Sequence, residues 1–373
     1  MLLVIADDIT GAAEIAGIAS QYGLDTIMTT HHELPNGNHD VIVFATDTRS
    51  SNEKDACNVV TEIANNIKGK DHITFFKKTD SVLRGHILPE TIALMSVLQL
   101  KKTLLLPQNP SKHRIINNGI YFINGVMLDK TAFNYDPEYP AKTAYVTEIV
   151  GANAVSLGIE DSISDNTIYI ADASSIEDID TQLSKADTET LVAGGADVFT
   201  AFLKKLFPSI TLPCQDIHVP YSESTIIVCG STQSKSLTNE QYIKNIKAKE
   251  ELMPDNVFEG EDATQWISQL KETYITNNVI IIGIGAKKNG GKLCAIRLKA
   301  IMADAVACLA EEKTPSLLII EGGATAYSII SRIGWNYFNI VGEYAPGVVG
   351  MTHGNTHIIL KPGSYPWGKL FEQ

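Results

Sequence analysis

The chain has 373 residues, of which 44% are hydrophobic, and it carries a formal net charge of −13 at pH 7. Because a single hydrophobic core stops growing at roughly 250–300 residues, this length predicts two domains. A protein that binds the phosphate backbone of nucleic acids normally presents a basic surface, so the acidic charge argues against nucleic acid as a partner.

The N-terminal residues begin a strand and show no export or membrane signal. Leu2–Ala6 is a short apolar run that predicts a buried strand, and Asp7 and Asp8 follow it at once. A signal peptide or a membrane span needs a longer apolar run, so neither is expected. The five cysteines form no CxxC pair, which disfavours a zinc site, and their odd number fits a reducing compartment. We therefore expect a cytoplasmic protein without a membrane partner.

Apolar and amphipathic runs alternate through the first 213 residues. Further short apolar runs predict buried strands at Val41–Ala45, Ile73–Phe76, Thr103–Leu106, Thr167–Ile170 and Leu191–Ala193. Helical spacing of apolar residues predicts helices at Thr10–Tyr22, Glu53–Ile67, Ile87–Leu98 and Ile176–Leu183. Continuous apolar strands that alternate with helices are typical of a parallel sheet covered on both faces.

A second block with the same alternation begins near residue 222. The proline-containing stretch Phe207–Tyr221 is the expected boundary, so we place one domain at 1–213 and the other at 222–373. The second domain is expected to contain strands at Thr225–Cys229, Val279–Ile282 and Leu317–Ile320, and helices at Leu237–Ile246, Leu298–Ala310 and Ala324–Ile333. The predicted fold class is α/β, with two domains whose parallel-rich sheets are covered by helices.

Charged side chains follow the first two strands, and ligands of open α/β sheets bind beyond the carboxyl ends of strands. Asp7 and Asp8 could hold a metal ion or act as a base, or one of them could cap the next helix, with Thr10 as an alternative cap. Arg49 could clamp a carboxylate in bidentate fashion, or pair with Asp47 at the surface. The pattern alone leaves these alternatives open.

The segment at the end of the third predicted strand carries the most functional side chains. Between Lys77 and Gly85 the chain combines cations, a carboxylate and hydroxyls: Lys77, Lys78, Thr79, Asp80, Ser81 and Arg84. A simple connection rarely carries so many functional groups, and loops on a rigid scaffold are where sites are built. We therefore favour a functional site in this loop.

Glycines follow two strands of the second block, just before a helix. They lie in Gly230–Ser231–Thr232 and in Gly322–Gly323–Ala324–Thr325. Glycines let the backbone approach phosphates, and a helix N-terminus offers N–H donors, so two such turns favour a nucleotide site over plain tight turns. The Gly283–Gly285 region lacks the GxGxxG spacing of a dinucleotide loop, and the chain has no GxxxxGK[ST] motif.

Together these motifs resemble the four-carbon acid sugar kinase family, which phosphorylates threonate, erythronate and 3-oxo-tetronate. In the first half the similar motifs are Ile5–Ala12 (IADDITGA), Thr46–Ser50 (TDTRS), Lys77–Gly85 (KKTDSVLRG) and Tyr121–Val126 (YFINGV). In the second half they are Gly230–Ser231 with Thr238 and Gln241, Gly322–Ala326 (GGATA), Ala345–Val348 (APGV) and Lys361–Gly363 (KPG). Their number and order along nearly the whole chain make the match specific.

The resemblance implies a sugar-acid-binding N-terminal domain, a nucleotide-binding C-terminal domain and an active site in the cleft between them. The implied substrate-binding residues are Asp7 or Asp8, Arg49, Lys78, Thr79, Asp80 and Ser81, to which the density of the loop adds Arg84. The implied nucleotide-binding residues are Ser231, Gly322, Gly323, Ala324, Thr325 and Gly347.

The chain departs from the family pattern at several places. Ala324 stands where the family usually has Asp, so any metal or ribose contact of that Asp is absent here or comes from another group such as Glu321. Pro107–Arg114 (PQNPSKHR) differs from the usual PAFP-x-x-GR, and the usual Gly-Phe-Gly does not follow Lys361–Gly363. The resemblance therefore does not decide which sugar acid is the substrate.

The expected activity is transfer of a phosphoryl group from ATP, with Mg²⁺, to a hydroxyl of a small sugar acid. Such transfer needs positioning and charge neutralisation more than covalent chemistry. Arg49 and Lys78 would bind the substrate carboxylate, and Asp80 or Asp8 would accept the hydroxyl proton, a choice that the sequence leaves open. The alternatives are a nucleotide-dependent dehydrogenase, favoured only by Gly283–Gly285, and a non-catalytic sugar-acid- or nucleotide-binding protein. A homo-oligomer is compatible with the sequence.

Overall fold

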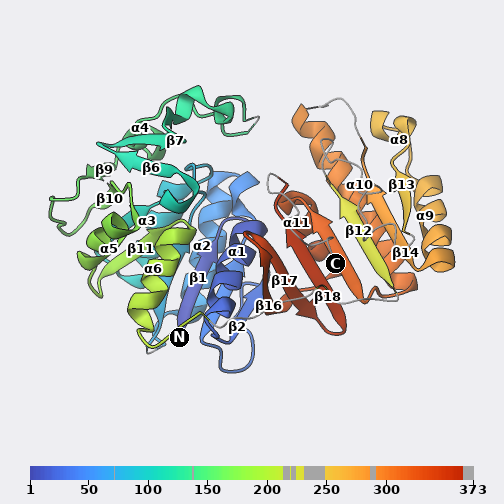
Figure 1. Cartoon of the computed structure of the whole chain (residues 1–373), viewed down its shortest axis with the longest axis horizontal. Coiled ribbons are helices and arrows are strands. Elements are labelled where there is room, and N and C mark those ends of the chain that lie inside the picture. Colours follow the sequence, from blue (N-terminus) through green and yellow to red (C-terminus); the bar gives the residue numbers. More distant parts are fainter. Residues whose placement is uncertain are drawn as a thin grey trace. The chain divides into compact units, whose positions relative to one another are not determined.

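The computed structural model describes residues 1–70, 72–136, 138–212, 219, 224–230, 248–285 and 291–363. The chain forms two compact units, Met1–Pro213 and Cys214–Gln373, which we call the first and the second unit. In each unit, helices flank a sheet of mostly parallel strands (Figure 1). Among the described residues, no helix combines the length and the apolar character that crossing a bilayer requires.

The first unit is built on a parallel sheet with the strand order β2-β3-β1-β4-β11-β5-β10-β9. Its strands are β1 (Leu2–Ala6), β2 (Thr26–Thr29), β3 (Val41–Ala45), β4 (Thr74–Lys78), β5 (Lys102–Leu106), β9 (Ala154–Leu157), β10 (Ile168–Ala171) and β11 (Thr190–Gly194). All residues of β1 and β3 are buried, as expected for central strands that are covered on both faces.

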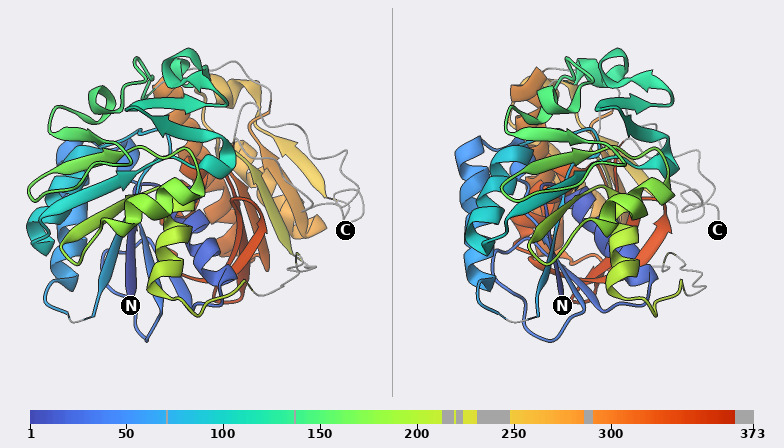
Figure 2. Two further views of the ribbon diagram at one scale, coloured as in Figure 1. Left: turned by 60° about the vertical axis from the view of Figure 1, so that its left-hand side comes forward. Right: turned by 90° about the vertical axis from the view of Figure 1, so that its left-hand side faces the viewer.

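Helices cover both faces of this sheet (Figure 2). On one face, α6 (Ala196–Leu206) packs against both α1 (Ile9–Gln21) and α5 (Ile176–Ser184), and on the other α2 (Glu53–Ile67) packs against α3 (Ile87–Leu98). The short helix α4 (Val146–Val150) precedes β9. Because side chains alternate along a strand, neighbouring residues of β4 face different helices.

The carboxyl ends of the central strands are level. Ala6 of β1 pairs with Ala45 of β3 on one side and with Lys78 of β4 on the other. The loops that follow these three strands therefore leave the sheet at one edge and side by side.

A small antiparallel sheet follows β5. Its strands are β6 (Arg114–Asn117), β7 (Ile120–Ile123) and β8 (Val126–Met127). Ile116 and Tyr121 of this sheet are buried in one core cluster with Val82 and Leu83. This packing brings the small sheet against the loop that connects β4 to α3.

The second unit has the strand order β13-β14-β12-β15-β18-β17-β16. Its strands are β12 (Thr225–Cys229), β13 (Lys249–Leu252), β14 (Val279–Gly283), β15 (Leu317–Glu321), β16 (Tyr337–Ala345), β17 (Val348–His353) and β18 (Thr356–Lys361). Its helices are α8 (Asp255–Glu259), α9 (Thr264–Asn277), α10 (Gly291–Glu312) and α11 (Gly323–Ile333). The strands from β13 to β18 in this order are parallel, whereas β16, β17 and β18 form an antiparallel meander.

The predicted α/β class is confirmed, and most expected strands are found within a residue or two of their predicted bounds. The apolar pattern misses β13, whose sequence Lys-Glu-Glu-Leu has the charged character that is typical of exposed edge strands. It also misses β2, β6 to β9 and the antiparallel strands β16 to β18. The expected helix at Leu237–Ile246 lies outside the described residues.

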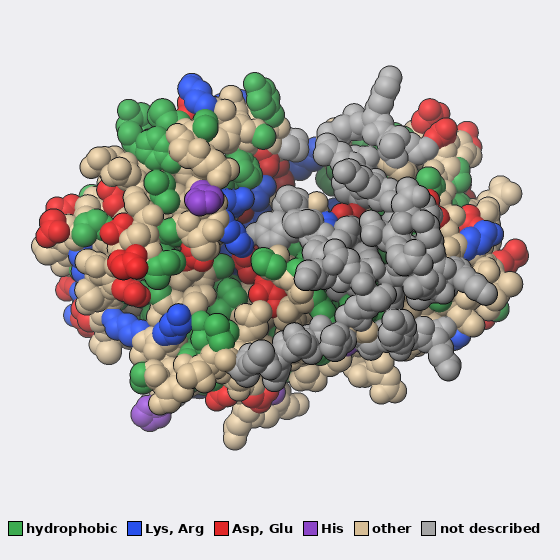
Figure 3. All heavy atoms as spheres, viewed as in Figure 1, with side chains coloured by type: hydrophobic (Ala, Val, Ile, Leu, Met, Phe, Trp, Pro, Cys, Tyr) green, Lys and Arg blue, Asp and Glu red, His purple; other side chains and the backbone are tan. Residues whose placement is uncertain are grey.

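Acidic side chains are spread over the face shown in Figure 3, with basic side chains between them, in keeping with the net charge of −13.

Candidate active site

The loops after β1, β3 and β4 gather the predicted substrate-binding side chains of the first unit. Asp7 and Asp8 follow β1, Arg49 follows β3, Lys78 ends β4, and Asp80, Ser81 and Arg84 lie between β4 and α3. These groups form one connected set of ion pairs and hydrogen bonds, which we call the strand-end cluster.

Arg49 is held by three aspartates. Its Nε and Nη2 each donate to one oxygen of Asp7 at 2.9 Å, and its Nη1 donates to Asp8 Oδ2 at 3.0 Å. The same Nη1 lies 3.7 Å from Asp80 Oδ1, and the Arg49 side chain is 15% exposed. Arg49 is thus a mostly buried partner of Asp7 and Asp8 rather than a surface residue paired with Asp47. In this arrangement its donors face carboxylates of the protein, which leaves little for a substrate carboxylate.

Asp8 both binds Arg49 and caps α1, so the predicted helix cap is Asp8 and not Thr10. Its side chain accepts from the Gly11 N–H at 2.9 Å and from the Thr10 hydroxyl at 2.7 Å. A Cβ at Gly11 would lie 2.5 Å from Asp8 Oδ1 and 3.3 Å from Lys78 Nζ. The glycine of the IADDITGA motif is therefore required because these two charged groups approach its backbone.

Asp80 organises the loop after β4. Its Oδ2 accepts from the backbone N–H of Val82 at 3.1 Å and of Arg84 at 3.2 Å. Arg84 also donates from Nε to Oδ2 at 3.0 Å and from Nη2 to Oδ1 at 2.9 Å. Gly85 follows with φ +92°, and a Cβ there would lie 3.2 Å from Asp7 Oδ2. The loop is thereby folded tightly against the end of β1.

The two adjacent lysines of β4 have different roles. Lys78 Nζ donates to the Thr79 carbonyl oxygen at 2.9 Å and lies 3.9 Å from Glu14 of α1. Lys77 points to the other face of the sheet and forms an ion pair of 2.6 Å with Glu90 of α3, in which both side chains are 1% exposed. Lys77 therefore does not belong to the strand-end cluster, although it lies in the same dense motif. Both lysines are the last residues of β4 rather than part of the following loop.

Ser81 is held from the small sheet. Tyr121 of β7 donates from its hydroxyl to the Ser81 carbonyl oxygen, and Arg114 of β6 donates from Nη1 to Ser81 Oγ. The neighbouring Thr79 hydroxyl is buried and has no hydrogen-bond partner among the described residues. Sequence reasoning did not assign Arg114 a role, because only the packing of the small sheet brings it to this loop.

Two further residues of the cluster come from the irregular stretch after β8. Asp136 accepts from Arg84 Nη1 at 3.0 Å, and the Tyr139 hydroxyl donates to the Arg49 carbonyl oxygen. Neither residue lies in a recognisable motif, so the sequence offered no signal for them.

The ion pairs determine how the aspartates titrate. Burial by itself would raise the pKa of Asp80, but Arg49 and Arg84 outweigh it and hold this pKa well below its usual value. Burial would likewise raise the pKa of Asp8, but Arg49 and Lys78 outweigh it and lower this pKa. Both carboxylates are therefore charged at neutral pH, and they are strong hydrogen-bond acceptors but weak bases.

The glycine-rich turn of the second unit lies at the start of α11. Gly322 is its N-cap with φ +99°, and no side chain caps the first turn. A Cβ at Gly230, which follows β12, would lie 2.7 Å from Thr325 Cβ. Gly230 therefore allows the end of β12 to approach α11, whose uncapped first turn is the arrangement that binds phosphates.

Glu321 and Lys361 form a buried ion pair beside this turn. Lys361 Nζ donates to Glu321 Oε1 at 2.6 Å, and the Gly322 N–H donates to the Lys361 carbonyl oxygen at 2.9 Å. Glu321 is thus bound to a cation, which makes it a poor substitute for the missing family Asp at exposed Ala324.

The other predicted nucleotide-binding residues are Gly347 and Ser231. Gly347 lies in the turn between β16 and β17 with φ +76°, and its N–H donates to the Glu343 side chain. Ser231, like Thr238 and Gln241, lies outside the described residues.

Within the part of the chain that the structure describes, no three His, Cys, Asp or Glu side chains are placed to hold a metal ion. The aspartates of the strand-end cluster are already bound by Arg49 and Arg84. Mg²⁺ in phosphoryl-transfer enzymes keeps several waters and binds mainly through substrate phosphates and one or two carboxylates. The residues present therefore fit a Mg²⁺ that arrives with a nucleotide, and they do not form a preformed metal cage.

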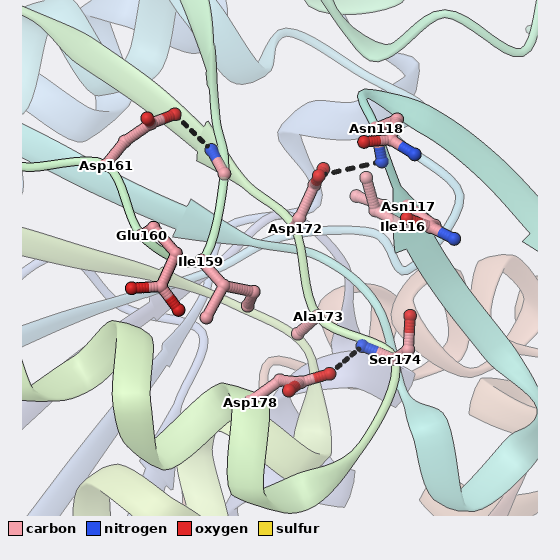
Figure 4. Close-up of a pocket in the computed structure, with 11 residues that line it drawn as sticks. Ile116, Asn117, Asn118, Ile159, Glu160, Asp161, Asp172, Ala173, Ser174 and Asp178 are labelled. Atoms are coloured by element: carbon pink, nitrogen blue, oxygen red, sulfur yellow. Dashed lines mark hydrogen bonds between the residues drawn. The ribbon is translucent and has the colours of Figure 1, made fainter.

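Hollows of the first unit lie near the end of β10 and beside the strand-end cluster. A hollow of about 430 Å³ near the end of β10 has an acidic wall (Figure 4). Its carboxylates hold turns, since Asp172 accepts from the Asn118 N–H at 2.7 Å and Asp161 from the Gly158 N–H at 2.8 Å. A hollow of about 320 Å³ adjoins the strand-end cluster, with Arg84 in its wall. We assign no separate ligand to either.

Comparisons with known proteins find a matching family model and named relatives. Residues 2–201 match the family model of the sugar-binding N-terminal domain. The D-erythronate kinase of Heliobacterium modesticaldum is 31% identical over 158 residues, which are 41% of this chain and 36% of that protein. The 3-oxo-tetronate kinase of Brucella melitensis is 25% identical over an alignment of 392 positions, gaps included, that covers 92% of this chain and 88% of that protein.

A solved structure shows the same fold. The crystal structure of a Haemophilus influenzae protein of the DUF1537 family matches with a TM-score of 0.74 and 20% identity over 99% of this chain and 98% of that one. The relatives named as kinases define the class of the protein, which is a kinase. The chain belongs to the four-carbon acid sugar kinase family.

Proposed function

We propose that the chain is an ATP-dependent kinase that phosphorylates a hydroxyl of a small sugar acid of the four-carbon class. The observation that carries the proposal is the strand-end cluster, in which Asp7, Asp8 and Asp80 surround Arg49 within the part that matches a sugar-binding domain. The names of the relatives support a four-carbon acid as the substrate.

Of the two candidate bases, Asp8 fits the reacting hydroxyl better. Both carboxylates accept from an arginine and from backbone N–H groups, but the side chain of Asp8 is 18% exposed, against 7% for Asp80. Phosphoryl transfer depends mainly on positioning and charge stabilisation, so a weakly basic carboxylate that orients the hydroxyl is sufficient. We therefore assign Asp8 to the hydroxyl and Asp80 to the shape of the loop.

The positive charges of the cluster divide into a scaffold and a binding group. Arg49 and Arg84 are engaged by aspartates, so they hold the loops together. Lys78 lies near the start of α1, and its closest carboxylate is 3.9 Å away at Glu14. Lys78 is therefore the better candidate for an anionic substrate group, together with the hydroxyl groups of Thr79 and Ser81.

The start of α11 supports the nucleotide assignment. The first-turn N–H groups of Gly323, Ala324 and Thr325 lack a side-chain cap, and the positive end of the helix dipole attracts phosphates. Bound ATP supplies the phosphoryl group, and Mg²⁺ neutralises charge on its phosphates. Ser231 and Gly347 are proposed to contact the same nucleotide on the basis of the family resemblance.

The kinase family assignment removes the support for a dehydrogenase. A non-catalytic binding protein is distinguished by experiment, since it would bind ligands without turnover. We expect ADP release from ATP in the presence of D-threonate, D-erythronate or 3-oxo-tetronate, dependent on Mg²⁺, and none with the uncharged polyol erythritol. Binding of these acids by titration calorimetry without any ADP release would favour the non-catalytic alternative, and neither binding nor release would overturn the proposal.

A further inference from the structure

All three arginines of the first unit lie at the strand-end cluster, and they differ in their carboxylate partners. Arg49 pairs with Asp7 and Asp8, and Arg84 pairs with Asp80 at 2.9 Å and with Asp136 at 3.0 Å. Arg114 has no carboxylate within ion-pair distance among the described residues. Among the described residues, Arg114 is thus the arginine of this cluster that has no carboxylate counter-ion.

The position of Arg114 is nonetheless well defined. Its backbone N–H donates to the Asn109 carbonyl oxygen at 3.1 Å, which anchors the start of β6. Its guanidinium donates to Ser81 Oγ and lies 5.7 Å from the centroid of the Phe133 ring. Arg84 lies at the same distance, 5.7 Å, from that ring. The guanidinium of Arg114 is therefore held beside the loop that the cluster organises.

This arrangement suits a carboxylate ligand. A guanidinium is a planar fork of N–H donors that binds carboxylates in bidentate fashion, and Arg114 uses one donor group on Ser81. Because Ser81 Oγ accepts from Arg114, its own O–H remains to donate to an acceptor, and no acceptor for it is found among the described residues. A carboxylate could receive bonds from both groups, and it would neutralise a partly buried cation.

We propose that Arg114, assisted by the Ser81 hydroxyl, binds the carboxylate of the sugar acid. This inference rests on the proposed function. It adds a residue of the small sheet to Lys78 in the carboxylate-binding role that the sequence suggested for Arg49 and Lys78, while Arg49 holds the aspartates in place. Arg114 is then the residue that selects acids over neutral sugars, since a neutral ligand leaves its charge unpaired.

The test compares the sugar acid that the wild-type enzyme uses best with the corresponding carboxamide, which has the same hydroxyls and no charge. For Arg114→Gln we expect the KM of the acid to rise about tenfold or more, as loss of a charge-assisted bidentate pair implies. The KM of ATP should stay within about twofold of wild type, and the carboxamide should bind equally to both proteins by calorimetry. Arg114→Lys keeps the charge and loses the planar fork of donors, so its KM for the acid should lie between those of wild type and Arg114→Gln. It serves as the second variant if Arg114→Gln does not fold.

The matched control is Arg332→Gln, which removes an arginine from an exposed pair with Asp304 in the second unit and should leave both KM values unchanged. An unchanged KM of the acid in both Arg114 variants overturns the inference and leaves the proposed function standing. An equal loss of affinity for acid and carboxamide also overturns it, because it shows a purely structural role. If the wild-type protein neither binds nor phosphorylates any sugar acid, the proposed function fails and the inference fails with it.

Discussion

Arg84 binds the Asp80 carboxylate in bidentate fashion: Nε donates to Oδ2 at 3.0 Å and Nη2 donates to Oδ1 at 2.9 Å. The two residues belong to a loop and not to a helix. The chain bends back on itself between them, and the Asp80 carboxylate fills the bend by accepting from the backbone as well. The loop that carries the candidate substrate groups is therefore shaped by one carboxylate.

Asp80→Asn should lower the melting temperature, and it should reduce kcat less than the substitution of Asp8 does, because Asp80 shapes the loop and does not contact the reacting hydroxyl. An amide places N–H donors against the Arg84 guanidinium, so the loop loses its charged acceptor. Asp8→Asn should reduce kcat by about 10²–10⁴-fold, as loss of the group at the reacting hydroxyl implies, with a smaller loss of stability, because its amide oxygen can still cap α1. Steady-state kinetics and thermal unfolding of both variants check this. Full activity of Asp8→Asn would show that the base is a different residue.

Arg49→Gln should destabilise the first unit, because it leaves three carboxylates without their shared cation. Removal of one partner from a buried ion pair typically costs about 3–5 kcal/mol. Urea denaturation measures the loss, with Arg332→Gln as the exposed control, for which we expect little change. If Arg49→Gln is as stable as wild type and raises only the KM of the sugar acid, Arg49 is the carboxylate ligand after all.

The pair Lys77–Glu90 should act on stability and not on catalysis. Lys77→Met leaves Glu90 charged and buried at 1% exposure, which should cost about 3–5 kcal/mol, whereas Lys77→Met with Glu90→Leu should recover most of the loss. A double-mutant cycle by urea denaturation tests the coupling. A change of more than about twofold in the KM of either substrate in the double variant would place Lys77 in the active site.

Gly230→Ala should weaken nucleotide binding and spare sugar-acid binding. The added Cβ would lie 2.7 Å from Thr325 Cβ, so α11 must shift at its first turn, where we expect the phosphates. Titration calorimetry with ATP and with the sugar acid separates the two effects within one protein, and the unchanged affinity for the sugar acid is the internal control. Wild-type affinity for ATP would argue against phosphate binding at this turn.

The cluster should make the protein sensitive to acid. The pKa values of Asp8, Asp80 and Asp136 are lowered in the folded state, against the effect of burial, by their arginine partners and hydrogen bonds. Their stabilising contribution is therefore complete above the unfolded pKa of about 3.9 and is lost as the pH falls below it. Between pH 5 and 3, urea midpoints should fall less for Asp136→Asn than for wild type. Exposed Asp180→Asn is the control and should follow the wild-type curve.

Most of the fold could be predicted because buried parallel strands are continuous apolar runs and their helices repeat apolar residues with helical spacing. The strands that were missed are β2, β6 to β9, β13 and β16 to β18. They are short, belong to antiparallel pairs, or, like β13 with its charged residues, lie at the end of a sheet. For the candidate site, the motifs located Asp7, Asp8, Arg49, Lys78, Asp80, Ser81 and Arg84. They did not indicate Asp136 or Tyr139, which lie in an irregular segment with no local pattern. Arg114 ends the stretch Pro107–Arg114 that was compared with PAFP-x-x-GR, but nothing in the sequence indicates that the small sheet brings it to Ser81.

The sequence by itself determined which charged residues stand at strand ends, since strand length and alternation are local properties of the chain. Only the tertiary structure decided their partners. Arg49 bonds to Asp7, 42 residues away, and not to Asp47, because the parallel register of β1 and β3 places the two strand ends side by side. Lys77 and Lys78 are neighbours in sequence, yet they face α3 and α1, because the pleat of a strand directs adjacent side chains to opposite faces. A side chain's partner depends on which elements become neighbours and in which register, and those are properties of the whole packed core.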